Sequence, residues 1–169
     1  MIPHFHLHRR TWYPWLFIGL TMVANASGYA ILQPAKPFEL FILITGAIGG
    51  FVHFLYSQHH QETQLFATLF KDFNERYDKL NEKLNTIISR NSGALLSQEN
   101  NKILYDYFNL CAEEYLYYSS GYIDHTVWIS WIHGMKYFAN DAEIRKLWET
   151  ELSSSSYYDF KLSLLDAVR

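Results

Sequence analysis

The sequence predicts an all-α protein: a transmembrane hairpin of two helices, followed by a long connecting helix and a small cytosolic helical bundle. Two apolar segments, residues 12–32 and 38–56, carry a single charge between them, Glu39. The next segment repeats its apolar residues at heptad spacing, and no later segment shows the alternation or hairpin turns of strands. We therefore expect a membrane hairpin in residues 1–56 and a cytosolic all-α domain in residues 57–169.

Each apolar segment is close to the length that crosses a bilayer. The first, WYPWLFIGLTMVANASGYAIL, is uncharged over 21 residues, or roughly 31 Å of helix. QPAKP follows, and its two prolines end one helix and turn the chain. Aromatic residues at the outer ends of the hairpin occupy positions typical of the membrane interface: Trp12, Tyr13, Trp15 and Tyr56. The segments therefore read as two spans joined by a short loop.

Two other structures compete with a membrane hairpin for these segments. A buried αα-hairpin in a soluble protein would need partner surface to cover two helices that are apolar all round, and so small a domain offers little. A cleaved signal peptide is imitated by HLHRR, an apolar run and Ala24-Asn25-Ala26, but the apolar run continues to Leu32. Membrane insertion is the expectation.

The charges that flank the spans predict their orientation. Arg9 and Arg10 precede the first span, the loop holds only Lys36, and Lys71 and Arg76 follow the second. The positive-inside rule then places both termini in the cytoplasm. Small residues four apart, Ala24 with Gly28 and Gly46 with Gly50, have the spacing of close helix packing in lipid, or reflect how common small residues are in such helices.

The segment after Ser57 predicts one long helix to about Ser89, without glycine or proline. Its apolar residues are spaced 4, 3, 4, 3, 4 and 3 apart, at Phe66, Phe70, Phe73, Tyr77, Leu80, Leu84 and Ile87. This heptad seam is typical of a coiled coil between subunits, and it also fits packing on the chain's own C-terminal helices. Because the helix continues from the second span, it would transmit a rearrangement of the domain to the bilayer.

Cap residues divide the remaining chain into shorter helices. Ser97 caps a helix that ends at Gly121, Asp124 caps a helix through Phe138, and Asp141 opens the helix AEIRKLWETEL. The serine run 153–156 then separates a last helix, predicted to reach about Arg169. The domain reads as a small all-α bundle.

No motif in the sequence indicates catalysis. A P-loop, GxGxxG, GxSxG and HExxH are all absent, and Cys111 has no signature of a nucleophile. His4, His6 and His8 alternate before Arg9 and read as solvated juxtamembrane residues rather than metal ligands. The net charge is −3, and residues 57–169 contain 11 Lys/Arg against 16 Asp/Glu. We expect no enzyme, metal site or cofactor, and no DNA or RNA polymer as a partner.

Two segments carry a resemblance to a known family: LFKDFNERYDKLNEKLNTI (Leu69–Ile87) and YFNLCAEEYLYYSSGYIDHTVWISWIHGM (Tyr107–Met135). With the membrane hairpin, the chain resembles the small membrane effectors of type III CRISPR defence that respond to cyclic tetra-adenylate, and the likeness covers most of its length. The resemblance implies a homotetramer whose cytosolic domain binds the cyclic nucleotide and whose spans perturb the membrane. It implies no particular binding residue.

Candidate ligand residues come from the cytosolic domain itself. Basic and aromatic side chains suit a nucleotide, because cations neutralise phosphates and aromatic rings stack on bases. Arg90 and Lys102 are the candidate phosphate ligands, Asn91 and His125 would bond ribose or base, and Tyr122 or Trp128 would stack on adenine. Two further readings stay open: an oligomeric membrane scaffold that docks a partner protein, and a holin-like toxin that acts without a ligand.

Overall fold

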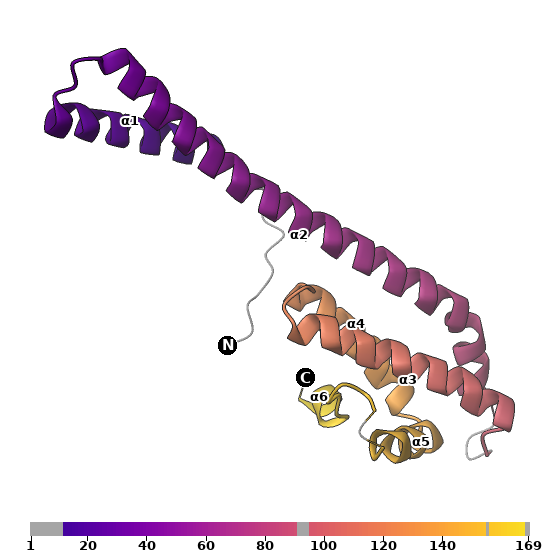
Figure 1. Cartoon of the computed structure of the whole chain (residues 1–169). Helices are drawn as coiled ribbons and strands as arrows, with labels where there is room; N and C mark the ends of the chain where they lie inside the picture. Colours follow the sequence, from indigo (N-terminus) through magenta and orange to yellow (C-terminus); the bar gives the residue numbers. More distant parts are fainter. Residues whose placement is uncertain (1–11, 91–94, 155, 168–169) are drawn as a thin grey trace. The chain divides into compact units, whose positions relative to one another are not determined.

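The structure, a computed structural model, describes residues 12–90, 95–154 and 156–167. Every element within these ranges is an α-helix, and they contain no strand (Figure 1): α1 (Tyr13–Leu32), α2 (Pro37–Ile88), α3 (Gln98–Ser119), α4 (His125–Ala139), α5 (Ala142–Leu152) and α6 (Ser163–Asp166). The predicted all-α class is confirmed. The chain divides into two compact units within α2, between Gln64 and Leu65, whereas the sequence predicts a division after Tyr56.

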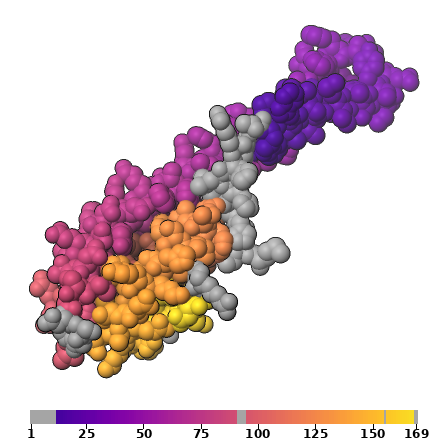
Figure 2. Space-filling view, turned by 180° about the vertical axis from the view of Figure 1, so that it is seen from behind, coloured from indigo at the N-terminus to yellow at the C-terminus, as the bar shows by residue number. Residues whose placement is uncertain are grey.

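In the N-terminal unit, residues 12–64, α1 lies along the first part of α2 (Figure 2). The rings of Tyr13 and Tyr56 meet edge to face with centroids 5.7 Å apart, and Asn25 Nδ2 donates to Thr45 Oγ1 at 3.4 Å. A Cβ atom at Gly28 would lie 3.0 Å from the side chain of Ile44. Since later residues of α1 meet earlier residues of α2, the two helices run antiparallel.

Both helices of this unit leave their apolar side chains uncovered. The most apolar 18-residue window of α1 is 0% buried within the chain, and that of α2 is 6% buried. Large apolar side chains are exposed on both helices, among them Trp15, Met22, Ile31, Phe38 and Leu43. Each helix is long and apolar enough to span a membrane. The structure therefore does not bury these helices as the core of a soluble domain.

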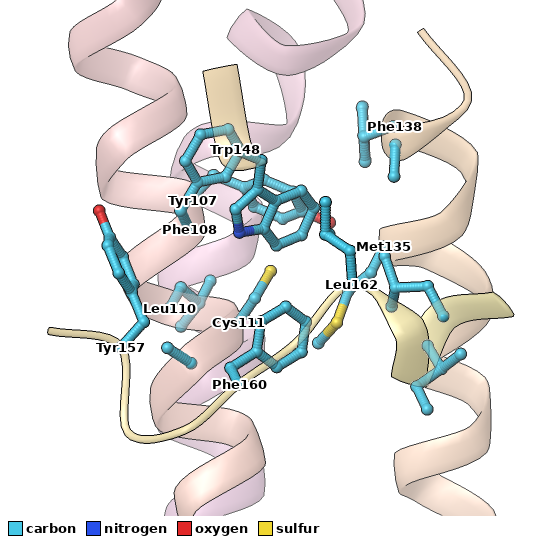
Figure 3. Packing of buried hydrophobic residues seen from close by; sticks show 14 of the residues in the cluster. Tyr107, Phe108, Leu110, Cys111, Met135, Phe138, Trp148, Tyr157, Phe160 and Leu162 are labelled. Carbon is cyan, nitrogen blue, oxygen red and sulfur yellow. The ribbon is translucent and has the colours of Figure 1, made fainter. Parts of the chain in front are cut away.

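The C-terminal unit, the described residues from Leu65 on, holds a hydrophobic core in which aromatic rings pack against one another and against aliphatic side chains (Figure 3). Trp148 of α5 is fully buried between two near-parallel rings: Phe108 at 4.5 Å and Phe160 at 5.6 Å between centroids. Tyr107 meets Phe138 edge to face at 5.2 Å. Most tyrosines and tryptophans of this unit thus lie in the core or pack against it.

The heptad seam of α2 packs into this same core. Phe66, Phe73, Leu84 and Ile87 are buried there, and Tyr77 and Leu80 pack against it. Phe70 is 40% exposed and stacks on Trp131 of α4, with ring centroids 6.2 Å apart. Of the two partners that the sequence leaves open for the seam, its own chain is the one the structure shows.

The predicted caps of the bundle helices are confirmed. Ser97 accepts a hydrogen bond from the backbone N–H of Asn100 at 3.1 Å, and Asp124 accepts one from Thr126 at 2.7 Å. Asp141 accepts from the N–H groups of Glu143 and Ile144, each at 3.1 Å. These side chains satisfy backbone donors that a helix leaves without partners in its first turn.

The predicted last helix is wrong. Where the sequence suggests a helix to about Arg169, the structure has only the four-residue α6. Tyr158 and Asp159 have φ angles of 50° and 61°, a left-handed backbone that a right-handed helix does not contain. The flanking Tyr157 and Phe160 are buried in the core. Burial of these rings holds the segment as a loop.

Candidate functional site

A cavity of about 180 Å³ lies between α2, α3 and α4 of the C-terminal unit. Its lining comes from all three helices: Asn74, Tyr77, Tyr107, Glu114, Ser130, Trp131, Gly134 and Met135. Tyr107, Glu114 and Met135 are buried, whereas Ser130 and Gly134 are exposed. The cavity therefore has a buried floor and a solvent-facing rim, which is the form of a small binding site.

Glu114 is the chemically distinctive residue of this cavity. Its side chain is 6% exposed, and its carboxyl group has no hydrogen-bond partner among the described residues. Burial raises the pKa of Glu114 to about 8; the Arg76 charge opposes this shift and the Glu113 charge adds to it. The carboxyl group is therefore mostly protonated and neutral at pH 7.

Arg76 does not neutralise Glu114, because it is bound to the neighbouring acid. Its Nη1 donates to Glu113 Oε2 at 2.5 Å and its Nη2 to Glu113 Oε1 at 3.2 Å. This hydrogen bonding, with the Glu113 charge, raises the pKa of Arg76 despite partial burial. Glu113 and Glu114 thus point in different directions, as adjacency on a helix requires.

The predicted phosphate ligand Arg90 occupies an ion pair in the structure. Its Nη2 donates to Asp141 Oδ1 at 2.7 Å, and its Nη1 donates to the carbonyl oxygen of Ile87, also at 2.7 Å. Lys102, the other predicted phosphate ligand, is exposed in the first turns of α3. Asn91 lies outside the described residues.

The predicted base-contacting residues cluster at the junction of α3 and α4. The Tyr118 hydroxyl and His125 Nδ1 are 3.0 Å apart and share a hydrogen bond. Trp128 is 3% exposed, and its ring stacks on that of Tyr118 with centroids 4.8 Å apart. Tyr122 is exposed and meets the edge of Tyr117. Within the chain Trp128 is thus a core residue whose faces are covered, and Tyr122 is the accessible ring.

The structure does not gather the predicted ligand residues into one pocket of a single chain. Lys102 lies near the start of α3, and Tyr118, which binds His125, lies near its end, so roughly 24 Å of helix separates them. Arg90 binds Asp141, which follows the C-terminal end of α4, while His125 begins that helix.

Glu114 was not among the residues selected from the sequence. The signal for it is its register on α3: Tyr107, Cys111, Glu114 and Tyr118 follow at spacings of 4, 3 and 4 and are all buried. A carboxylate on the apolar face of an amphipathic helix is uncommon, and it marks a candidate site. Considered only as a neighbour of Glu113, Glu114 does not show that it shares the buried face of α3.

Possible metal ligands in the described part of the chain are its His, Asp and Glu side chains and its single thiol, Cys111. No group of three or more His, Cys, Asp or Glu residues there could hold a metal ion. Cys111 is buried, and burial together with the Glu114 charge raises its pKa well above the ordinary value. A thiol held in its protonated form is a poor nucleophile. His4, His6 and His8 lie outside the described residues.

Comparison of the chain with protein family models, curated proteins and solved structures finds no match. Function must therefore be argued from the residues and geometry of the chain itself.

Proposed function

We propose that this chain is a ligand-gated membrane effector of antiphage defence. Four copies insert two helices each into the bacterial inner membrane, with both termini in the cytoplasm. The cytosolic domain binds cyclic tetra-adenylate, and the response of the spans permeabilises the membrane. The choice of nucleotide and of fourfold assembly rests on the family resemblance, and the membrane role also draws support from the geometry.

The uncovered apolar surface of α1 and α2 supports insertion. Water would have to cover aromatic and aliphatic side chains along both helices, whereas hydrocarbon solvates them at no such cost. Inside the pair, Asn25 Nδ2 donates to the carbonyl oxygen of Thr21 at 2.8 Å and also reaches Thr45, so this polar side chain does not face lipid unpaired. No atom of the described residues lies within 4 Å of a Cβ atom added to Gly46 or Gly50, which leaves their face open to a second copy.

The observation that carries the proposed gating is the continuity of α2. One helix of 52 residues contains the apolar span and, farther along, the core residues Phe73 and Leu84. Neither glycine nor proline interrupts it from Phe51 to Ile88. A change in how the bundle packs on its seam therefore acts on the same continuous helix that contains the proposed span.

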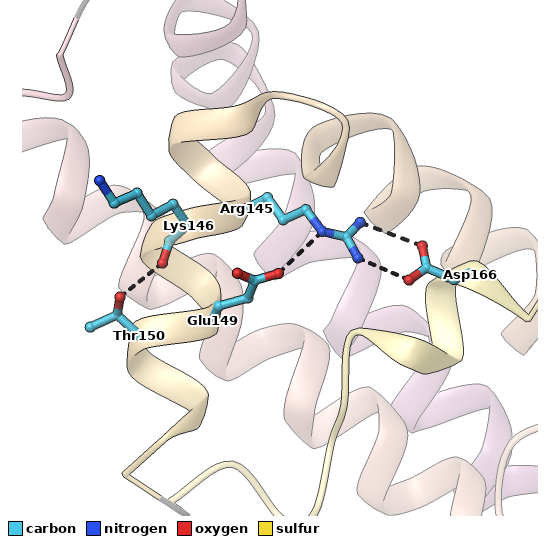
Figure 4. A network of polar contacts seen from close by, with 5 residues as sticks. All are labelled: Arg145, Lys146, Glu149, Thr150 and Asp166. Atoms are coloured by element: carbon cyan, nitrogen blue, oxygen red, sulfur yellow. Dashed lines mark hydrogen bonds and ion pairs between the residues drawn. The ribbon is translucent and has the colours of Figure 1, made fainter.

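Cyclic tetra-adenylate carries four phosphates, and the described arginines are already bound to acids. Arg76 pairs with Glu113 and Arg90 with Asp141, while Arg145 binds Asp166 and Glu149 (Figure 4). Among the described candidate residues, Lys102, Tyr122 and His125 are exposed. A fourfold axis would bring four copies of each to a ligand of the same symmetry, which offsets the acidic charge of one domain.

The test is calorimetric titration of the full chain in maltoside micelles with cyclic tri-, tetra- and hexa-adenylate, with mass measured by light scattering. We expect that only cyclic tetra-adenylate binds and that the protein which binds it is a tetramer. The same nucleotide should release dye from liposomes that contain the chain. Lys102→Ala should weaken binding at least tenfold, whereas Lys83→Ala, which removes an exposed lysine of α2, should not. Binding of no ring size contradicts the proposal.

The same liposomes separate the alternatives. Dye release without any nucleotide identifies a holin-like toxin. Neither release nor binding leaves a membrane scaffold for a protein partner.

A further inference from the structure

We propose that the cavity between α2, α3 and α4 binds a compact primary amine, whose ammonium group pairs with the carboxylate of Glu114 among aromatic walls. This site is separate from the residues proposed for the cyclic nucleotide, and the inference does not depend on that function.

The polar groups of the cavity suit a donor and not an anion. Its lining contains no lysine, arginine or histidine. Glu114 offers two carboxyl oxygens, and the Asn74 Nδ2 already donates to the carbonyl oxygen of Phe70 at 2.6 Å, which leaves Asn74 Oδ1 as an acceptor. An ammonium group has three N–H donors and no acceptor, so it complements this set.

The aromatic lining favours the same class of ligand. Tyr77, Tyr107 and Trp131 contribute their rings to the wall. The negative face of an aromatic ring attracts a cation, most strongly where both are removed from water. A buried carboxylate beside aromatic rings therefore recognises an ammonium group through charge, hydrogen bonds and ring faces together.

The charged groups around Glu114 leave a place for an incoming cation. Arg76 from α2 is the cation whose charge acts on Glu114, and both its terminal nitrogens bind Glu113. Burial holds the neighbouring Cys111, Tyr77 and Tyr107 in their neutral forms by raising their pKa values. An ammonium ion bound at Glu114 would supply a positive charge in direct contact with this carboxylate, a contact that Arg76 does not make.

The volume of the cavity limits the ligand. About 180 Å³ is below the roughly 300–1,000 Å³ typical of drug-sized sites, so one small ring or a short aliphatic chain fills it. Entry is from the rim, where a Cβ atom added to Gly134 would meet no atom within 4 Å. A primary amine with one apolar ring or branch fits these limits.

The site predicts a coupling between binding and protonation. At neutral pH the Glu114 carboxyl group is protonated, because burial raises its pKa to about 8. Pairing with an ammonium ion requires the carboxylate, so binding transfers the carboxyl proton to the buffer. Affinity should then rise about tenfold for each pH unit from 6 to 8 and level off above that range.

The experiment is calorimetric titration of the full chain in an uncharged maltoside with benzylammonium chloride at pH 6, 7, 8 and 8.5. Each titration is run in two buffers of different ionisation enthalpy, which counts the protons released. We expect about one proton per amine at pH 6, about half a proton at pH 8, and the tighter affinity at the higher pH. Benzyl alcohol, which has the same ring without the charge, should bind without proton release or pH dependence.

Two variants and one control decide the role of the cavity. Glu114→Gln keeps the shape of the neutral acid and should lower benzylammonium affinity at pH 8 at least tenfold and abolish proton release. Asp106→Asn removes a carboxylate from the exposed side of the same helix and should leave both unchanged. Gly134→Leu fills the rim and should block binding without touching Glu114, which keeps the test valid if Glu114→Gln fails to fold.

The proposal is overturned if benzylammonium does not bind at pH 8.5. It is also overturned if both Glu114→Gln and Gly134→Leu bind it as tightly as the parent chain does. A result in which the amine binds and cyclic tetra-adenylate does not would leave this site standing and remove the proposed gating function.

Discussion

Arg90 ties the end of α2 to the start of α5 through Asp141. One guanidinium nitrogen donates to the Asp141 carboxylate and another to the carbonyl oxygen of Ile87, each at 2.7 Å. The Asp141 carboxylate also caps α5 by accepting from the backbone of Glu143 and Ile144. A residue chosen from the sequence as a phosphate ligand therefore has a structural task within the chain.

Replacement of Arg90 by Gln should destabilise the C-terminal unit. The Arg90 side chain is 13% exposed and that of Asp141 is 24% exposed, so loss of these charge-assisted hydrogen bonds should cost about 1–3 kcal/mol of unfolding free energy. Urea denaturation followed by near-ultraviolet circular dichroism measures the change. Lys102→Gln, at an exposed lysine, should change the free energy by less than about 0.5 kcal/mol. Equal effects of the two variants would contradict the structural role.

Asp141→Asn should reveal an acid-sensitive contribution to stability. Burial acts to raise the pKa of Asp141, but hydrogen bonds from Ile144 and Arg90, the Arg90 charge and the Glu143 N–H together lower it below 3.8. The stabilisation is therefore present at neutral pH and lost as pH falls through this lowered pKa. Since asparagine also caps helices well, the variant removes mainly the charge. Parent and variant should differ in stability at pH 7, and the difference should shrink as pH falls from the ordinary aspartate pKa of 3.8 through the lowered pKa of Asp141.

Glu114 should make the chain less stable as pH rises, whereas Asp141 makes it less stable as pH falls. Glu114→Gln should remove the effect of Glu114. Burial raises the pKa of Glu114 from 4.5 to about 8, so between these values the folded chain binds the proton more tightly than the unfolded chain does. The free energy of unfolding should fall as pH rises across this window, by on the order of 3–5 kcal/mol in total, and level off above it. Glutamine has no such titration and should flatten this part of the curve. A parent chain whose stability is unchanged from pH 5 to 8 would contradict the burial of this acid.

Trp148 should be the most sensitive position of the core. Its ring lies between Phe108 and Phe160, and its Nε1 is buried with no hydrogen-bond partner among the described residues. Trp148→Ala should cost about 3–5 kcal/mol through the cavity it leaves. Trp148→Phe should cost markedly less, because it keeps a ring in the stack and removes the unsatisfied N–H group. Equal losses in the two variants, measured by urea denaturation, would argue against the stacked arrangement.

Gly134→Ala should stabilise the chain. Gly134 lies inside α4, where an added Cβ atom meets no other atom within 4 Å, and alanine in a helix interior is favoured over glycine by about 0.5–1 kcal/mol. Gly28→Ala offers a contrast, because its Cβ atom would lie 3.0 Å from Ile44. Thermal unfolding in micelles should show a higher midpoint for Gly134→Ala and a smaller gain or a loss for Gly28→Ala.

The sequence by itself determined the helices and where most of them begin. Ser97, Asp124 and Asp141 act within one turn of their own helices, so local chemistry was enough to predict them. The apolar composition of residues 12–32 and 38–56 and the heptad spacing of α2 were likewise visible in the residues alone. The last helix was missed because burial of Tyr157 and Phe160 overrides the local preference, and such burial depends on contacts far along the chain.

The tertiary structure alone decided which partners these helices meet. A heptad seam presents the same apolar stripe to a sister subunit or to its own bundle, and only the packed core places Phe73 and Leu84 inside the chain. Trp128 and Glu114 show the same limit, since a residue name does not tell whether a ring is covered or a carboxyl group buried. Burial is set by which helix faces pack together, and it is burial that closes Trp128 to a ligand and shifts the pKa of Glu114.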